Sequence, residues 1–147
     1  MQGSNPKDHT PGSIPEGEEL FDPVRRKKVR ATPEERVRQE FIRYLHEAKG
    51  HPYGLMEVEK GFQLHKVHKR CDILTRDPEL NPFMIVECKA PDIPIDQGVF
   101  DQIVRYNIAF KVPYLVVTNG REHYACHVGR SEQELRFLTE IPKFRER

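Results

Sequence analysis

Hydrophobic and polar positions divide the chain into two helices and a series of short strands. Helical spacing of apolar residues appears twice, after Thr32 and between about Gln97 and Phe110. Apolar or alternating runs that are typical of strands occupy five further stretches, at residues 55–62, 70–74, 83–90, 113–118 and 124–128. The order helix, three strands, helix, two strands predicts a three-layer α/β core.

The first helix has a recognisable start and end. Thr32 can cap it, Pro33 fits its first turn, and Glu35 completes a capping box. Gly50-His51-Pro52 ends it. A stripe at helical spacing is expected to face the core, formed by Val37, Phe41, Tyr44, Leu45 and Ala48.

Turn residues predict how the strands connect. Asp22-Pro23 favours a hairpin between Leu20 and Arg30. The Pro- and Asp-containing turn at residues 77–82 predicts that the strands on either side of it pair antiparallel. Asn119-Gly120 is typical of a two-residue hairpin turn.

The two ends of the chain carry weaker patterns. Residues 1–19 hold prolines and glycines with few apolar side chains, so we expect a flexible leader followed by one domain at residues 20–147. Ser131 and Glu134 form a capping box that predicts a short final helix. The basic tail at residues 143–147 is expected to fray.

Composition narrows the class of protein. The 147 residues have no apolar run of membrane-spanning length and no secretory signal pattern, which favours a cytoplasmic protein without membrane contact. The 24 Lys and Arg nearly balance the 23 Asp and Glu, so nucleic acid could be bound only by local clusters. The three cysteines form no C-x-x-C pair, which argues against a zinc knuckle or a redox pair.

Two basic clusters stand out. They are candidates for contacts with a phosphate backbone, although a solvated surface is the ordinary alternative. One cluster precedes the first helix and the other leads into the second strand; their members are Arg25, Arg26, Lys27 and Lys28, and Lys66, Lys69 and Arg70.

The strand at residues 83–90 carries charges that a buried strand rarely holds. Because side chains alternate, Glu87 and Lys89 share one face and Cys88 takes the other. Asp72 lies in the preceding strand among apolar neighbours, beside Cys71. Such charges are costly unless they meet a partner, a metal or a substrate. The alternatives are an edge strand whose outer face is solvated, or a structural ion pair.

Antiparallel pairing would bring Asp72 and Glu87 together. Two carboxylates in contact repel one another unless a cation lies between them. Oxygen ligands suit a hard ion, so we expect Mg²⁺ or Mn²⁺, with the backbone carbonyl of Cys88 as a further ligand. The Cys71 and Cys88 side chains are expected to be small buried groups on the opposite strand face.

Asp72 followed by Glu87-x-Lys89 resembles the PD-(D/E)xK nuclease signature. Gln102 and Tyr106, one helical turn apart, resemble the Q-x-x-x-Y element of RecB-like branches of that superfamily. Between about residues 20 and 128 the chain is similar to the N-terminal nuclease domain of type I restriction enzyme R (HsdR-type) subunits. The segments 21–28 and 32–39 contribute to that resemblance.

The resemblance implies a restriction-endonuclease-like fold, a mixed central sheet flanked by helices. It also implies a Mg²⁺-dependent endonuclease of restriction or DNA-processing type that leaves a 5′-phosphate and a 3′-hydroxyl. Lys89 would position the attacking water and counter the transition-state charge, Gln102 would orient water or phosphate, and Tyr106 would shape the cleft. Related nucleases place an acidic residue of the first helix near the metal, which suggests Glu40.

The chain departs from that family at two points. Cys71 stands where the superfamily name has proline, and these 147 residues are too few to include the helicase motor that type I R subunits couple to this domain. The chain would then be a standalone nuclease, a subunit that acts with partners, or a domain that binds without cutting. The expected partners are DNA, other restriction or helicase subunits, and a second copy of the chain in a homo-oligomer. A non-cleaving nucleic-acid-binding or assembly module with the same fold is the main alternative. An α/β domain with a structural Glu87–Lys89 pair is another.

Overall fold

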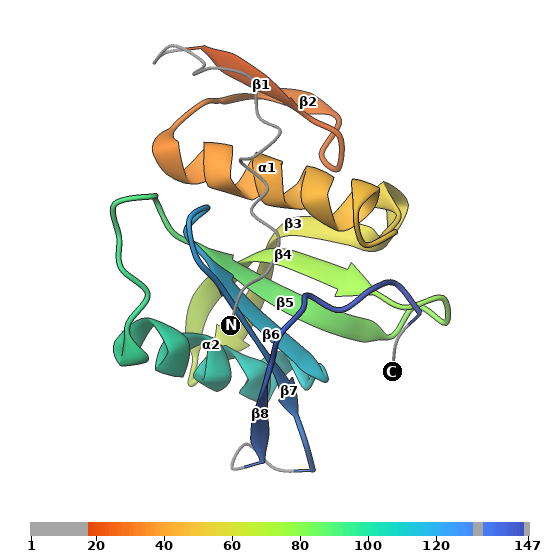
Figure 1. Ribbon diagram of the computed structural model, residues 1–147, viewed down its shortest axis with the longest axis vertical. Helices are drawn as coiled ribbons and strands as arrows, with labels where there is room; N and C mark the ends of the chain where they lie inside the picture. Colours follow the sequence, from red (N-terminus) through yellow and green to blue (C-terminus); the bar gives the residue numbers. More distant parts are fainter. Residues whose placement is uncertain (1–17, 131–133, 146–147) are drawn as a thin grey trace.

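A computed structural model describes residues 18–130 and 134–145 of the chain (Figure 1). Over these residues the chain forms a two-stranded sheet, a six-stranded sheet and two α-helices. The elements are β1 (Glu19–Asp22), β2 (Lys27–Arg30), α1 (Pro33–Glu47), the short 3₁₀ helix η2 (Tyr53–Leu55), β3 (Met56–Leu64), β4 (Val67–Arg76), β5 (Pro82–Cys88), α2 (Gln97–Phe110), β6 (Tyr114–Thr118), β7 (His123–Val128) and β8 (Leu135–Leu138).

The larger sheet is mixed and has the order β3-β4-β5-β6-β7-β8. All neighbours pair antiparallel except β5 and β6, which run parallel and are joined through α2. Parallel neighbours need such a crossover because the chain must return to the same end of the sheet. The α/β class and the mixed sheet agree with the prediction.

The two helices cover opposite faces of this sheet, which produces three layers (Figure 1). On one side, α1 packs in a cluster that includes Phe41, Leu45 and Val86. On the other side, α2 packs in a second cluster around Ile103 and Leu115. The β1–β2 hairpin lies over α1, on the side away from the sheet (Figure 1).

The capping of α1 is only half as predicted. Thr32 Oγ1 accepts a hydrogen bond from the Glu35 backbone N–H at 3.1 Å. The Glu35 carboxylate does not close the box, because it binds guanidinium and amide groups, and the Thr32 N–H donates to the Arg30 carbonyl. At the other end Ala48 is exposed as the C-cap while Lys49 is buried, so the core stripe ends at Leu45.

The second helix has the predicted bounds. Asp96 caps it by accepting the Val99 N–H at 3.0 Å, and Lys111 ends it in a left-handed conformation with φ 53°. The buried face of α2 carries Phe100, Ile103, Tyr106 and Asn107.

Two connections differ from the prediction. The basic stretch before Arg70 is part of a long β3–β4 hairpin whose turn is His65-Lys66, both with positive φ. The β6–β7 connection has four residues, because Asn119 Oδ1 accepts the N–H groups of Arg121 and Glu122 and so stabilises a wider turn than Asn-Gly predicts.

The C-terminal region also differs from the prediction. In place of the expected helix, Leu135–Leu138 forms β8, because the open edge of β7 offers hydrogen-bond partners that local capping signals cannot anticipate. Residues 131–133, including Ser131, lie outside the described residues, as do the expected leader at residues 1–17 and residues 146–147. The tail does not simply fray, since the Phe144 N–H donates to the Lys49 carbonyl at 2.9 Å.

Candidate active site

The predicted acidic pair lies where β4 and β5 run side by side. Their register matches Ile73 with Val86, and one further step brings Asp72 opposite Glu87. The contact is anchored by the backbone, because the Cys88 N–H donates to Asp72 Oδ2 at 2.6 Å. The antiparallel pairing expected from the turn at residues 77–82 is therefore confirmed.

Lys89 completes this arrangement at the end of β5. Its backbone N–H donates to the Thr118 carbonyl of the parallel neighbour, which fixes the strand end. Its Nζ lies 3.7 Å from Glu87 Oε2, so the two side chains share a face as predicted. Cys88 points the other way and is buried among residues of the α1 side. One cluster therefore contains two acids and a lysine that are separated in the sequence: Asp72, Glu87 and Lys89. We call it the acidic cluster.

The strand is irregular at Asp72 itself. Cys71 packs on the α2 side and Ile73 on the α1 side, although residues two apart in a regular strand share a face. The pairing with β3 breaks at the same point, where Glu59 has φ 56°. A non-glycine residue in this region is strained, and such strain is frequent at functional sites. Sequence alternation alone could not reveal this twist.

Burial and mutual repulsion disturb the acids of the cluster. Burial and then the charge of Asp72 raise the pKa of Glu87 to about 8, against the opposing charge of Lys89. Burial also raises the pKa of Asp72, although the Cys88 N–H and Arg38 oppose this. Buried Glu87 Oε1 finds no hydrogen-bond donor among the described residues. Glu87 and Asp72 also form a side-chain hydrogen bond, so it is Oε1 that is left for a cation.

Sequence reasoning missed two residues of α1 that border the cluster. Arg38 Nη1 donates to Asp72 Oδ1 at 3.2 Å. Burial and the charge of Asp72 raise the pKa of Glu34, which places its carboxyl within the electrostatic reach of the pair. The signal was present, because Glu34 and Arg38 are four residues apart and therefore share one face of the helix.

Glu40, the acidic residue expected from the first helix, lies on a different side of α1. It is two residues beyond Arg38, which is about 200° around the helix axis. Since Arg38 contacts Asp72, Glu40 projects away from the acidic cluster. Glu34 is the better candidate for an acid supplied by α1.

Gln102 and Tyr106 face the acidic cluster from α2. Gln102 Nε2 donates to the Tyr106 hydroxyl at 2.9 Å, and the Tyr106 ring packs edge-on against Phe62 with centroids 4.9 Å apart. Burial and the charge of Glu87 raise the pKa of Tyr106. The predicted shared face of these two residues is confirmed, and their position near Glu87 follows from the packing of α2 on β5.

The basic clusters divide into two kinds of residue. Arg25 differs from its predicted role, because its guanidinium binds the carboxylates of Asp22, Glu35 and Glu59. The other predicted phosphate-contacting residues are exposed on the two hairpins: Arg26, Lys27, Lys28, Lys66, Lys69 and Arg70. These side chains are open to solvent, although Arg70 Nη1 also lies 3.7 Å from Glu59 Oε2, whereas Arg25 is committed to the fold.

The oxygen donors of the acidic cluster are few for a divalent ion. In the described part of the chain no group of three His, Cys, Asp or Glu side chains is arranged to hold a metal. Two carboxylates with a backbone carbonyl still fit Mg²⁺, which keeps several waters and uses one or two carboxylates. The unsatisfied Oε1 of Glu87 and the raised pKa of both acids fit such an ion as well.

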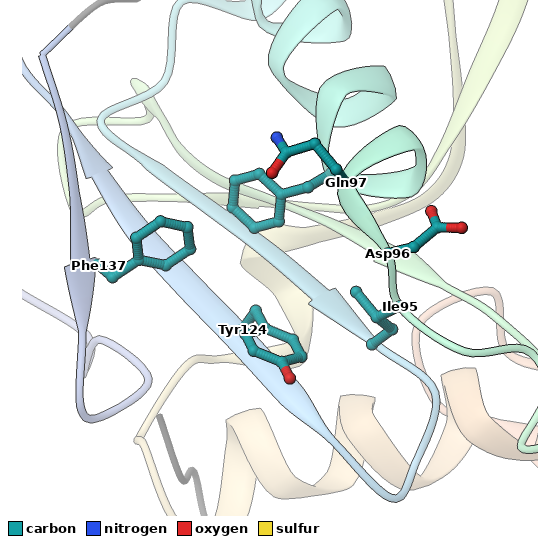
Figure 2. A pocket seen from close by; sticks show the side chains of 6 residues that line it. Ile95, Asp96, Gln97, Tyr124 and Phe137 are labelled. Carbon is teal, nitrogen blue, oxygen red and sulfur yellow. The ribbon is translucent and has the colours of Figure 1, made fainter.

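A separate hollow of about 370 Å³ lies at the start of α2 (Figure 2). It is lined by Ile95, Asp96, Gln97, Phe100, Tyr124 and Phe137. None of these was predicted as a site residue, and the lining is mainly apolar and aromatic. Hydrolysis of a phosphate ester needs charged groups, so the acidic cluster is the better candidate for chemistry.

None of the helices in the described ranges has the length and apolarity to cross a membrane.

Comparisons with known proteins agree with this architecture. The family model described as "Type I restriction enzyme R protein N terminus (HSDR_N)" matches residues 33–142. A fragment structure assigned as an HsdR subunit of a type I restriction enzyme from Vibrio vulnificus YJ016 superposes with a TM-score of 0.51 at 20% identity. The match covers 69% of this chain and 22% of that chain, and at this identity it shows the fold alone. A search of curated proteins finds no match.

Proposed function

The chain belongs to the family of type I restriction enzyme R protein N-termini, and we propose that it is a metal-dependent nuclease domain that hydrolyses DNA phosphodiester bonds. The observation that carries this proposal is the acidic cluster. Glu87 is 8% exposed, has a pKa of about 8 beside Asp72, and holds an oxygen without a donor in the part of the chain that the structure describes. An acid whose pKa is strongly perturbed by burial and by a specific charged neighbour is a candidate for a functional site.

Asp72, Glu87 and the backbone carbonyl of Cys88 would hold Mg²⁺ or Mn²⁺. A bound ion of this kind polarises the phosphate and lowers the pKa of coordinated water. The remaining roles belong to residues of the chain. Asp72 is fixed by the Cys88 N–H, so one acid is held in place before substrate arrives.

Lys89 supplies positive charge where negative charge develops. Its Nζ beside Glu87 lies on the same strand face and is in reach of a phosphate oxygen or of the attacking water. Gln102, held by Tyr106, offers an amide that can orient water or a phosphate oxygen. Tyr106 would form the wall of the cleft and keep the Gln102 side chain in one rotamer.

The exposed basic side chains of the two hairpins would contact the DNA backbone. Arg26, Lys27 and Lys28 on the first hairpin and Lys66, Lys69 and Arg70 on the β3–β4 hairpin carry this role. Partners are proposed from the family: other subunits of a restriction enzyme or a helicase.

The test uses purified protein with plasmid and with single-stranded DNA, in Mg²⁺ or Mn²⁺ and then in EDTA. We expect metal-dependent cutting, lost in Lys89→Ala by about 10²-fold or more while DNA binding stays. Lys143→Ala, an exposed lysine of the C-terminal segment, is the control and should cut like wild type. Equal cutting by wild type and Lys89→Ala would refute the assigned chemistry.

A non-cleaving binding module is the second candidate, and one observation favours it. Arg38 already neutralises one oxygen of Asp72, as it would in a protein that uses the acid only for structure. That candidate predicts DNA binding with no product in any divalent ion, and no Mn²⁺ binding by the cluster.

A further inference from the structure

The guanidinium of Arg38 lies where a cation is expected to act. Arg38 is 8% exposed, and its Nη1 donates to Asp72 Oδ1 at 3.2 Å. Asp72 Oδ2 accepts the Cys88 N–H at 2.6 Å. Both oxygens of the acid are therefore engaged by the protein itself.

The position of Arg38 is set by Glu35 rather than by Asp72. Its Nε and Nη2 donate to the two oxygens of Glu35 at 3.0 and 2.6 Å, a bidentate pair one turn back on the same helix. Glu35 is held in turn by Arg25 at 3.0 Å and by Gln39 at 3.1 Å. The third nitrogen, Nη1, makes the longest of these contacts and is the one that can be given up.

The two contacts of Arg38 differ in strength. A bidentate charged pair at 2.6–3.0 Å holds the planar fork, whereas a single bond at 3.2 Å restrains only one oxygen of Asp72. Loss of the Nη1 contact leaves the guanidinium paired with Glu35, so it costs one charged hydrogen bond and not the whole network. The positive charge of Arg38 then stays near the site but no longer covers Asp72.

We propose that Arg38 is a competing cation for the site: in the metal-free protein its Nη1 covers Asp72 Oδ1, and a divalent ion displaces it while Glu35 retains the guanidinium. This inference rests on the proposed function and adds a positioning residue that sets metal affinity. Arg38 would keep the acidic cluster folded without metal and weaken binding of metal until concentration or substrate favours it.

The test is a titration of the metal-stripped full chain with Mn²⁺ alone, followed by calorimetry, in wild type and Arg38→Met. Methionine fills a similar volume without charge, and Glu35 keeps Arg25 and Gln39 as partners. We expect Arg38→Met to bind Mn²⁺ about tenfold more tightly, the effect of one charged hydrogen bond lost from the competing state.

Two variants separate direct competition from a general change of charge. Arg25→Met removes the same charge from the same network, without a contact to Asp72, and should change the affinity by less than about threefold. Arg38→Lys keeps the charge but cannot grip Glu35 with two nitrogens and reach Asp72 together, so tighter binding is expected there as well. Arg38→Lys therefore provides the same test if Arg38→Met fails to fold.

A second readout follows the side chain itself. In NMR spectra of wild type, the Nε–H signal of Arg38 should move on addition of Mg²⁺ while that of Arg25 stays. Mn²⁺ binding by wild type with unchanged or weaker binding by Arg38→Met and Arg38→Lys would overturn the inference alone. No Mn²⁺ binding by any of these proteins would overturn the proposed function together with it.

Discussion

Two charged clusters meet at Arg38 and differ in how well their charges are matched. On one side, buried Glu35 accepts bonds from Arg25, Arg38 and Gln39, so each of its oxygens has donors. On the other side, equally buried Glu87 has one ammonium at 3.7 Å and an oxygen without a donor among the described residues. Both residues have an exposed fraction of 8%.

The difference shows that burial of an acid does not by itself indicate function. Donors lower the pKa of Glu35 despite its burial, whereas burial and the neighbouring Asp72 raise the pKa of Glu87. A paired acid holds the fold together. An acid left short of donors beside another acid costs stability, and a ligand that supplies positive charge would recover it.

The largest effect is expected from breaking the matched cluster. Glu35→Ala leaves two guanidinium groups without their shared partner, and loss of one member of a buried pair costs about 3–5 kcal/mol. Urea unfolding followed by circular dichroism measures the free energy of unfolding. Glu57→Ala, which removes a more exposed partner of Arg76, should cost less than ~1 kcal/mol. Equal losses in the two variants would contradict the comparison.

Metal should repair the unmatched cluster. At a Mn²⁺ concentration of 100 times Kd, wild type should gain about 2.7 kcal/mol of unfolding free energy at pH 8, and EDTA should reverse it. The same urea series gives the value. Asp72→Asn and Glu87→Gln should gain much less, since each lacks one carboxylate. A gain as large in these variants would place the metal elsewhere.

The unmatched acid should also give stability a distinctive pH dependence. The pKa of Glu87 is raised from 4.5 to about 8. Protonated Glu87 therefore contributes fully to the free energy of unfolding below pH 4.5, and this contribution is lost as pH rises toward 8. Glu87→Gln cannot ionise, and should therefore be more stable than metal-free wild type by about 2 kcal/mol at pH 8.5 and alike at pH 4.5. Thermal melts across this range test the sign; a wild type favoured at high pH would refute it.

The smallest effect is expected where polar groups are already satisfied beside the cluster. Tyr106→Phe removes the hydroxyl that accepts a hydrogen bond from the Gln102 amide. The free energy of unfolding should fall by about 1 kcal/mol. Gln102 would then be free to rotate. We therefore expect the loss in cleavage rate, expressed as a free energy, to exceed the loss in unfolding free energy. Steady-state cleavage and urea unfolding on the same preparation compare the two losses. Unchanged cutting would remove Gln102 from the proposed mechanism.

Local signals in the sequence were sufficient for most elements. Thr32 and Pro33 mark the start of α1, and the bounds of α2 follow from its apolar spacing. The alternation of Glu87, Cys88 and Lys89 gave the correct faces, because a single strand fixes its own side-chain directions. Where the outcome depended on a neighbour, local signals failed, as at β8 and at the Asn119 turn.

The sequence by itself determined which acids and which lysine belong to the candidate site, and the layered α/β arrangement around them. Only the tertiary structure decided how those charges are paired. It shows that Arg25 serves the fold, and that Arg38 and Glu34 border Asp72 while Glu40 projects elsewhere. It also shows that Glu87 Oε1 has no hydrogen-bond donor within residues 18–130 and 134–145. The physical reason is that the pairing of a charge depends on distances between elements far apart along the chain. Spacing within one helix or strand fixes only the direction in which each side chain points.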